Sequence, residues 1–141
     1  MSTQQSMIFL PVLGQVLLTL VVYISLAVAK SRAIESGQVD LDRRALHGDA
    51  WPESVVKINN NIRSQFEVPV LFYVVSIVLW LLGAAGLLAQ LLAWLFLASR
   101  VVHAYIHTGS NYIPTRLAVF KFGFLVVFLM LGLAVWAVPG R

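Results

Sequence analysis

A single charged residue, Glu67, interrupts the stretch between Ser64 and Ser99. A run of this length is foreign to soluble domains, and so is the composition of the chain, with 60% hydrophobic and 11% charged residues. Runs of about 20 apolar residues can cross the hydrocarbon core of a bilayer as helices. The 141 residues leave room for about four such spans. The chain is therefore predicted to be an all-α integral membrane protein, a four-transmembrane-helix bundle in a single domain covering residues 1–141.

Polar and turn-forming segments separate the predicted spans. Met7 to Ala29 carries no charge and no Lys or Arg precedes it, which favours a retained first helix over a cleaved signal peptide. Residues 30–52 are charged and small, with Gly37 and Gly48 as breakers, and form the one sizeable loop. Helices are expected at about 7–29, 53–83, 86–107 and 115–138, with a tight turn at Gly83–Gly86 between the second and the third.

The second and third spans are short if only their uncharged residues are counted. Each uncharged leg has about 15 residues and covers about 22 Å, against a hydrocarbon core of roughly 30 Å. Polar flanks must therefore enter the membrane, and folding the hairpin about positions 84–85 places Glu67 at the depth of Val102. We predict an intramembrane ion pair between Glu67 and Arg100, with Arg63, one turn back on the same helix, as the alternative partner.

Two polar faces are predicted, each with its side chains at helical spacing. They consist of Asn60, Arg63, Ser64 and Glu67 on the second helix and of Arg100, His103 and His107 on the third. Polar faces in a membrane turn towards each other or towards a neighbouring subunit rather than towards lipid. Pro69 is expected to kink the second helix and to free a carbonyl beside the Glu67 carboxylate.

The residues alone leave the role of these faces open. They fit a site for a polar ligand, but Glu67, Arg100 and His103 equally fit a buried network that fixes the helix register. His103 and His107 have the i, i+4 spacing of a metal pair that Glu67 could complete, yet no outer-shell pattern is visible, so no metal is predicted. The chain has no cysteine, which excludes thiolate ligands and a cysteine nucleophile.

The basic residues predict the orientation in the membrane. Six lie in the first loop and the polar start of the second helix, three cluster at the turn after the third helix, and one lies on the opposite side: Lys30, Arg32, Arg43, Arg44, Lys57 and Arg63; Arg100, Arg116 and Lys121; and Arg141. By the positive-inside bias, the first loop is cytoplasmic and both termini lie on the opposite side. The net charge of +4 thus reflects topology, and no basic run with interleaved aromatic residues suggests a nucleic-acid partner.

Three motifs carry a resemblance to a known family. They are Gln65-Phe66-Glu67-Val68-Pro69, Arg100 with His103 and His107, and Asn111 followed by Arg116-Leu117-Ala118-Val119-Phe120. Together with the span count and loop sizes, they resemble the MAPEG family, the membrane-associated proteins of eicosanoid and glutathione metabolism, which includes the microsomal glutathione transferases. The resemblance covers nearly the whole chain. It implies a left-handed four-helix bundle, a homotrimer, and glutathione held near the cytoplasmic face between adjacent subunits, with a lipophilic second substrate arriving from the bilayer.

The resemblance also assigns residues. Glu67 stands where the family has its glutathione-binding glutamate, Arg100 matches the arginine that opens the helix-three motif, and Arg116 lies close to the helix-four arginine thought to stabilise the thiolate. Arg116 is therefore the candidate catalytic residue. The candidate glutathione-binding residues are Asn60, Arg63, Ser64, Glu67, Arg100, His103 and His107. This chain departs from the transferases at Asn60 and Ser64, where they carry arginine and asparagine, and it has histidines where the family often has tyrosines in helix three.

The chemistry of glutathione fits these residue types. Its two carboxylates and its ammonium suit guanidinium groups and an acid, which Arg63, Arg100 and Glu67 supply. An arginine such as Arg116 lowers the pKa of the glutathione thiol by favouring the anion. The function predicted is a glutathione-dependent transferase or peroxidase acting on lipophilic substrates at the cytoplasmic face. The alternative is a non-catalytic trimer that binds membrane lipids or serves as a scaffold; a small transporter has little support, since no paired broken helices are visible.

Overall fold

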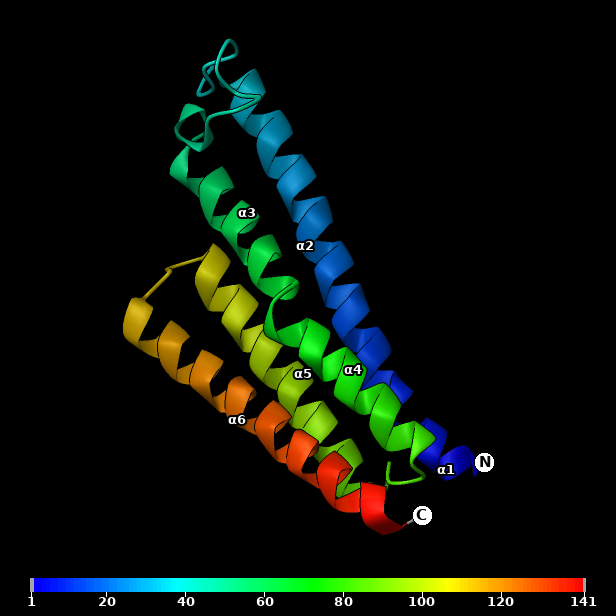
Figure 1. Ribbon diagram of the computed structural model, residues 1–141. Helices are drawn as coiled ribbons and strands as arrows, with labels where there is room; N and C mark the ends of the chain where they lie inside the picture. Colours follow the sequence, from blue (N-terminus) through cyan, green and yellow to red (C-terminus); the bar gives the residue numbers. More distant parts are fainter. Residues whose placement is uncertain (1, 141) are drawn as a thin grey trace.

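The computed structural model describes residues 2–140, and within them the regular structure is entirely helical. Its elements are α1 (Thr3–Ser6), α2 (Phe9–Glu35), α3 (Glu53–Gln65), α4 (Val68–Leu81), α5 (Leu87–Thr108) and α6 (Ile113–Ala137), with single 3-10 turns at Gly48–Ala50 and Val138–Gly140. Figure 1 shows both ends of the chain at one end of the bundle and the loop between α2 and α3 at the other. Arg141, the basic residue assigned to the side of the termini, lies outside the described residues.

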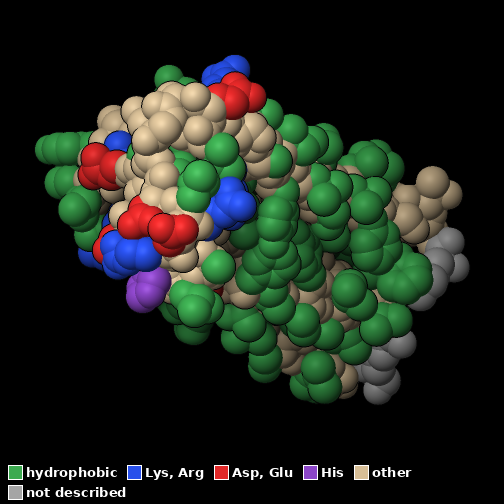
Figure 2. Space-filling model, turned by 90° about the horizontal axis from the view of Figure 1, so that it is seen from above, with side chains coloured by type: hydrophobic (Ala, Val, Ile, Leu, Met, Phe, Trp, Pro, Cys, Tyr) green, Lys and Arg blue, Asp and Glu red, His purple; other side chains and the backbone are tan. Residues whose placement is uncertain are grey.

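Four segments within residues 2–140 are long and apolar enough to cross a membrane: Thr3–Glu35, Glu53–Leu81, Leu87–Thr108 and Ile113–Ala137. The predicted fold class, an all-α membrane bundle with four spans, is confirmed. Large apolar side chains remain exposed along the helices, and Figure 2 shows them over the sides of the molecule while charged side chains gather towards the end that carries the loop. A surface of this kind is suited to hydrocarbon along the sides and to water at the end.

The first long helix extends further than predicted. α2 continues through Glu35, so the loop begins at Ser36 rather than at residue 30. Arg32 lies in the last turn of α2, where a cation is favourable against the negative end of the helix dipole. The Lys30 Nζ atom lies 5.0 Å from the centre of the Trp51 ring, a cation–π contact that ties this extension to the segment leading into α3.

The predicted second helix is interrupted at Glu67. α3 ends at Gln65 and α4 begins at Val68, and between them Glu67 has φ −96° and ψ −104°, which is not helical. Pro69 lies in the first turn of α4, where its missing N–H leaves no bond unmade. In an unbroken helix its ring would clash with the carbonyl of Gln65. The predicted distortion at Pro69 is confirmed, and it is a full break that divides one membrane span into two helices.

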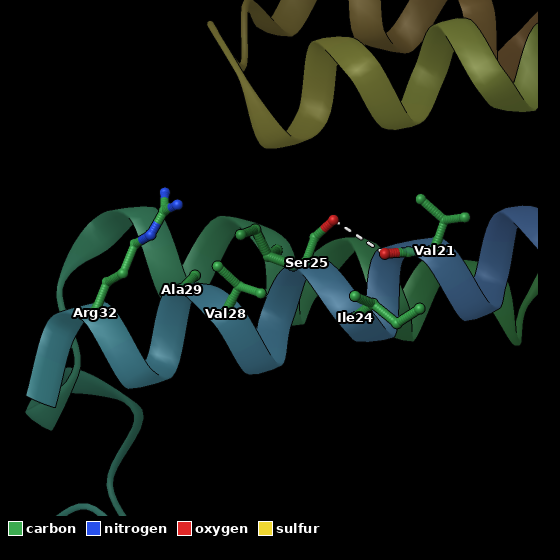
Figure 3. A pocket seen from close by; sticks show the side chains of 7 residues that line it. Val21, Ile24, Ser25, Val28, Ala29 and Arg32 are labelled. Carbon is green, nitrogen blue, oxygen red and sulfur yellow. Dashed lines mark hydrogen bonds between the residues drawn. The ribbon is translucent and has the colours of Figure 1, made fainter.

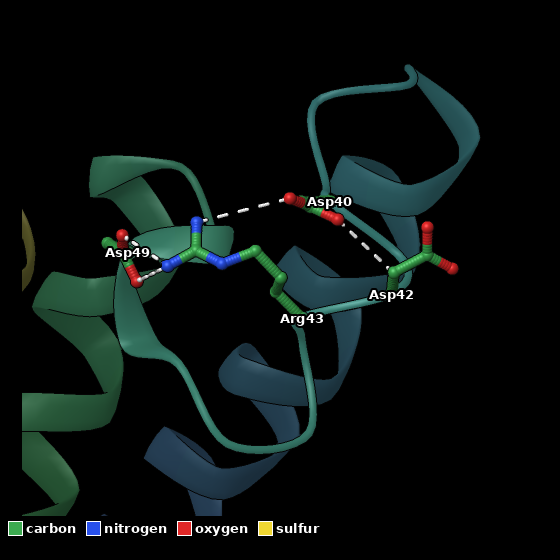
Figure 4. Close-up of polar contacts among 4 residues, drawn as sticks. All are labelled: Asp40, Asp42, Arg43 and Asp49. Atoms are coloured by element: carbon green, nitrogen blue, oxygen red, sulfur yellow. Dashed lines mark hydrogen bonds and ion pairs between the residues drawn. The ribbon is translucent and has the colours of Figure 1, made fainter.

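The loop between α2 and α3 is organised by Arg43 (Figure 4). Its Nη2 donates to both carboxylate oxygens of Asp49 at 3.0 and 3.2 Å, while its Nη1 lies 4.0 Å from Oδ2 of Asp40. The hydrogen bond from Arg43 holds the pKa of Asp49 below its usual value. Because these side chains are exposed, the interactions order the loop but are screened and contribute little to stability.

The larger core surrounds two stacked rings, Phe72 of α4 and Phe96 of α5. Both side chains are 0% exposed, and their ring centres are 4.3 Å apart. α6 packs closely on the same part of α5 because Gly123 has no side chain there. A Cβ at Gly123 would stand 2.8 Å from Ser99 Oγ and 3.7 Å from the Phe96 ring. α5 and α6 thus approach each other closely at Gly123, where no larger side chain fits.

Gly123→Leu is expected to lower the free energy of unfolding by about 1–3 kcal/mol, because the new side chain overpacks the contact between α5 and α6. Unfolding by a denaturing detergent, followed by circular dichroism, measures the loss. Gly132→Leu on the same helix is the matched control, since a Cβ at Gly132 meets nothing within 4 Å. Leucine is also the better helix former, so the control should be neutral or slightly stabilising. Equal losses in the two variants would contradict the close approach at Gly123.

Candidate functional site

A polar cleft of about 250 Å³ lies among α3, α5 and α6, beside the break at Glu67. It is lined by Asn60, Ser64, Glu67, His103, His107, Arg116, Leu117 and Phe120. Six of the eight residues singled out from the sequence therefore line one cavity, and two, Arg63 and Arg100, do not. The lining combines a carboxylate, a guanidinium, two imidazoles, an amide and a hydroxyl. This set can pair with anionic and cationic groups of one polar ligand.

Arg100 lies behind the cleft rather than in it. Its side chain is 2% exposed, and its Nη2 donates to the backbone oxygen of Ser64 at 3.3 Å and to Ser64 Oγ at 3.0 Å. In a continuous helix the Ser64 carbonyl would accept the N–H of Val68, whereas here it accepts the N–H of Glu67 at 3.4 Å and, in addition, the bond from Arg100. The Ser64 carbonyl is therefore shared between two donors and is not freed by the break. Arg100 uses it to join α5 to the end of α3.

The predicted ion pair between Glu67 and Arg100 is wrong. Among residues 2–140, the ion pairs within 4.0 Å are those of Arg43 in the loop. The prediction assumed an unbroken helix, whereas the break leaves Glu67 exposed at the mouth of the cleft. The alternative partner, Arg63, is also exposed and does not pair with Glu67. Neutral acceptors on Ser64 bind Nη2 of the buried guanidinium without removing a second charge from water, while its Nε is buried without a hydrogen-bond partner within residues 2–140.

The two histidines lie one turn apart on α5 and are both buried. Their ring centres are 5.4 Å apart, and the His103 ring is 6.1 Å from that of Phe120 on α6. His107 Nδ1 lies 3.2 Å from Nδ2 of Asn61 on α3. No group of three or more His, Cys, Asp or Glu side chains suited to a metal ion occurs within residues 2–140. The histidines therefore contact aromatic and amide partners.

Arg116 is positioned by the turn between α5 and α6. Its Nη1 donates to Asn111 Oδ1 at 2.6 Å. Asn111 adopts φ +52°, a left-handed conformation that asparagine tolerates better than most residues, and its backbone N–H donates to Ile106 at 2.7 Å. Lys57 of α3 also donates to the turn, from Nζ to the Gly109 carbonyl at 3.3 Å. The turn is thereby tied by side-chain hydrogen bonds to α3 and α6, two of the three helices that line the cleft.

Sequence reasoning missed three buried amides behind the cleft, Gln15, Asn61 and Gln65, which are 0%, 0% and 1% exposed. Gln15 Nε2 donates to Gln65 Oε1 at 2.7 Å, and Gln65 Nε2 donates to Asn61 Oδ1 at 2.9 Å. A signal was present in the sequence, because an amide inside an apolar run such as Gln15 needs a hydrogen-bonding partner in the membrane.

An apolar groove of about 350 Å³ continues from the cleft between α4 and α6. It is lined by Val68, Leu71, Val74, Val75, Phe124, Val127, Phe128 and Leu131. The two cavities are neighbours because Glu67 lines the cleft and Val68 the groove, while Phe120 of the cleft and Phe124 of the groove lie one turn apart on α6. One seam of the molecule is therefore polar at one end and apolar along the rest.

A roomier groove of about 510 Å³ runs along α2 and reaches Ile58 of α3 (Figure 3). Figure 3 shows its side chains from Val21 to Arg32 along one side of α2, with Ser25 Oγ donating to the Val21 carbonyl at 3.0 Å. Arg32 is its one charged lining residue, and it holds no acid and no histidine. Compared with this groove and the apolar one, the smaller polar cleft is the better candidate site because it brings acid, base and amide groups together.

A model of the MAPEG family matches residues 8–136, a range that includes all residues of the polar cleft and of the adjoining groove. No curated protein and no solved structure matches the chain.

Proposed function

Because the chain belongs to the MAPEG family, we propose that it is a glutathione-dependent membrane enzyme, a transferase or peroxidase that acts on lipophilic substrates. The observation that carries the proposal is the polar cleft, where Glu67, His107 and Arg116 reach one cavity from three different segments. Glutathione has two carboxylates, one ammonium and one thiol. The carboxylate of Glu67 suits the ammonium, and the guanidinium and imidazole groups suit the anions.

Arg116 is the proposed catalytic residue. A guanidinium next to a thiol favours the thiolate, the form that attacks an electrophile, so no protein nucleophile is required. Its bond to Asn111 restricts the guanidinium, which reduces the reorganisation needed when the charge develops. Arg100 has a different place in this proposal from the one the family pattern suggested. It holds the Ser64 end of α3 and supports the cleft from behind.

The apolar groove supports a lipophilic second substrate. Its lining has no polar side chain, and it begins where the polar cleft ends. A substrate with its reactive carbon at the cleft and its apolar tail along α4 and α6 would meet suitable surroundings at both ends. Such a molecule would partition into the bilayer and reach the seam from the side of the protein.

The proposal includes a homotrimer with its clefts at the cytoplasmic face. Arg63, Glu67 and Lys121 are exposed on membrane-length segments, where contact with lipid would be costly. Neighbouring subunits would cover these side chains. The basic residues of the loop and of the turn after α5 support the cytoplasmic assignment by the positive-inside bias.

A non-catalytic lipid-binding trimer is the second candidate. The apolar groove favours it, because a lipid tail could occupy this groove without any thiol chemistry. The two candidates differ in the polar cleft, which binds glutathione in the first and serves only to join helices in the second.

Calorimetric titration of the detergent-solubilised protein with glutathione tests the proposal. Saturable binding is expected, and Glu67→Gln should weaken it about tenfold or more, since a charged hydrogen bond to the ammonium is worth about 1.5–3 kcal/mol. Glu53→Gln is the matched control, because Glu53 is exposed in the first turn of α3 and does not line the cleft. Absence of binding to the wild-type protein, with lipids retained through purification, would favour the lipid-binding alternative.

A further inference from the structure

A chain of three buried amides runs from α2 through α3 to the ring of His107 on α5. Gln15 donates to Gln65, Gln65 donates to Asn61, and Asn61 Nδ2 faces His107 Nδ1 at 3.2 Å. Each bond points the same way along the chain, so each amide polarises the next. This series of hydrogen-bonded amides ends at His107, which lines the polar cleft.

The direction of this chain sets the tautomer of His107. In the observed direction Asn61 donates, so Nδ1 accepts, and the proton of the neutral ring must be on Nε2. In the reverse direction Nδ1–H would donate to Asn61 Oδ1, and the end of the chain would leave the amino group of Gln15 unpaired. In the observed direction the unpaired atom there is a carbonyl oxygen, Gln15 Oε1. Buried unpaired carbonyls are tolerated better than buried unpaired N–H groups, which favours the observed direction.

The other ring nitrogen of His107 is free to meet a ligand. Within residues 2–140, Nε2 has no hydrogen-bond partner, whereas Nδ1 has Asn61. The neighbouring His103 presents its ring to His107 edge-on, and its own Nδ1 is buried without a partner, so it offers no competing bond through that atom.

We propose that His107 presents its Nε2–H to an anionic group of the ligand in the cleft, and that Asn61, Gln65 and Gln15 are positioning residues that hold this tautomer. The inference rests on the proposed function for the identity of the ligand, glutathione, whose carboxylates and thiolate are such anions. His107 is then a hydrogen-bond donor and not the base that deprotonates the thiol, because its Nε2 already carries a proton.

Nitrogen NMR of the ¹⁵N-histidine-labelled protein in detergent tests the tautomer without any ligand. The chain has three histidines, and His47→Gln and His103→Gln variants assign the signals. The expected result for His107 is a protonated Nε2 and an unprotonated Nδ1. In Asn61→Leu and in the remote Gln15→Leu both tautomers should appear, whereas Asn59→Leu, an exposed position on the same helix, should leave the signals unchanged. A wild-type ring protonated on Nδ1, or an Asn61→Leu ring still protonated only on Nε2, would overturn the inference.

Titration of the same samples with glutathione tests the contact. The His107 Nε2 signal should shift on saturation, and Asn61→Leu should raise the Kd about two- to fivefold, because only the fraction of rings that carries the Nε2 proton can donate, while Asn59→Leu should leave the Kd unchanged. Unfolding midpoints of the variants show whether they fold. Binding that leaves the His107 signal unmoved and is equal in Asn61→Leu overturns the inference and leaves the proposed function standing. No binding to the wild-type protein instead overturns the proposed function and the ligand contact together, and the ligand-free spectra still decide the positioning role.

Discussion

Arg116→Ala is expected to abolish the ultraviolet thiolate signal of bound glutathione at neutral pH and to slow thiol conjugation by about 10²–10³-fold. This is the usual effect of removing one preorganised group that stabilises developing charge. The arginine lies in the polar cleft and is restrained by Asn111 at 2.6 Å, so its charge is already in place before the thiol ionises. Difference absorbance during a glutathione titration measures the thiolate signal. Turnover of a lipophilic electrophile measures the rate of conjugation.

Lys121→Ala is the matched control for Arg116. Lys121 is exposed on the same helix, carries the same charge, and does not line the cleft. Lys121→Ala should leave the thiolate signal intact if the signal depends on the position of Arg116 in the cleft and not on the net charge of the protein. A signal that persists in Arg116→Ala, or that falls equally in the two variants, would remove Arg116 from the proposed chemistry. Binding should survive Arg116→Ala more fully than thiolate formation does, since the other lining residues remain.

Arg100→Leu is expected to lower the free energy of unfolding by about 3 kcal/mol. The change removes both hydrogen bonds from the guanidinium to Ser64 and empties part of a tightly enclosed site. The free energy of unfolding of Arg100→Lys should lie between those of the wild-type protein and Arg100→Leu. An ammonium keeps the charge but lacks the planar fork of the guanidinium. Denaturing-detergent titrations followed by circular dichroism compare the three proteins.

Arg63→Leu provides the contrast for Arg100. Arg63 lies on α3 in the same part of the membrane, but its side chain is exposed. Its replacement should change the free energy of unfolding of the solubilised monomer by no more than about 0.5 kcal/mol. Similar losses for Arg63→Leu and Arg100→Leu would mean that charge at this depth, and not the bond to Ser64, stabilises the bundle.

The four spans could be predicted because bilayer thickness fixes the length of an apolar run, whatever the packing. The break before Pro69 could be predicted because the ring of proline acts on its own helix. The extension of α2 to Glu35 could not be predicted. A charged residue such as Lys30 after an apolar run is typical of a loop, and its contact with Trp51 is seen only in the structure.

The failure at Arg100 has a similar cause. Depth along a membrane span can be counted from sequence, but which way a side chain turns about the helix axis depends on its neighbours. The level of Glu67 relative to Arg100 was calculated for one straight helix, and the break changed the direction of Glu67. The bond between Gln15 and Gln65 spans 50 residues and joins two helices, so it depends on the same rotation. The roles of the residues in the cleft stay predictions.

The interruption at Glu67 allows substitutions in one half of the span, α4, to be accepted without altering the structure of the other half, α3. α3 carries the polar lining of the cleft and is anchored to α5 through Arg100, whereas α4 carries only apolar lining of the groove. Because the helical hydrogen-bond ladder stops between them, substitutions that widen or narrow the groove on α4 need not twist α3. Under the proposed function, a lineage built on this chain could therefore exchange one hydrophobic substrate for another while its glutathione site is inherited unchanged.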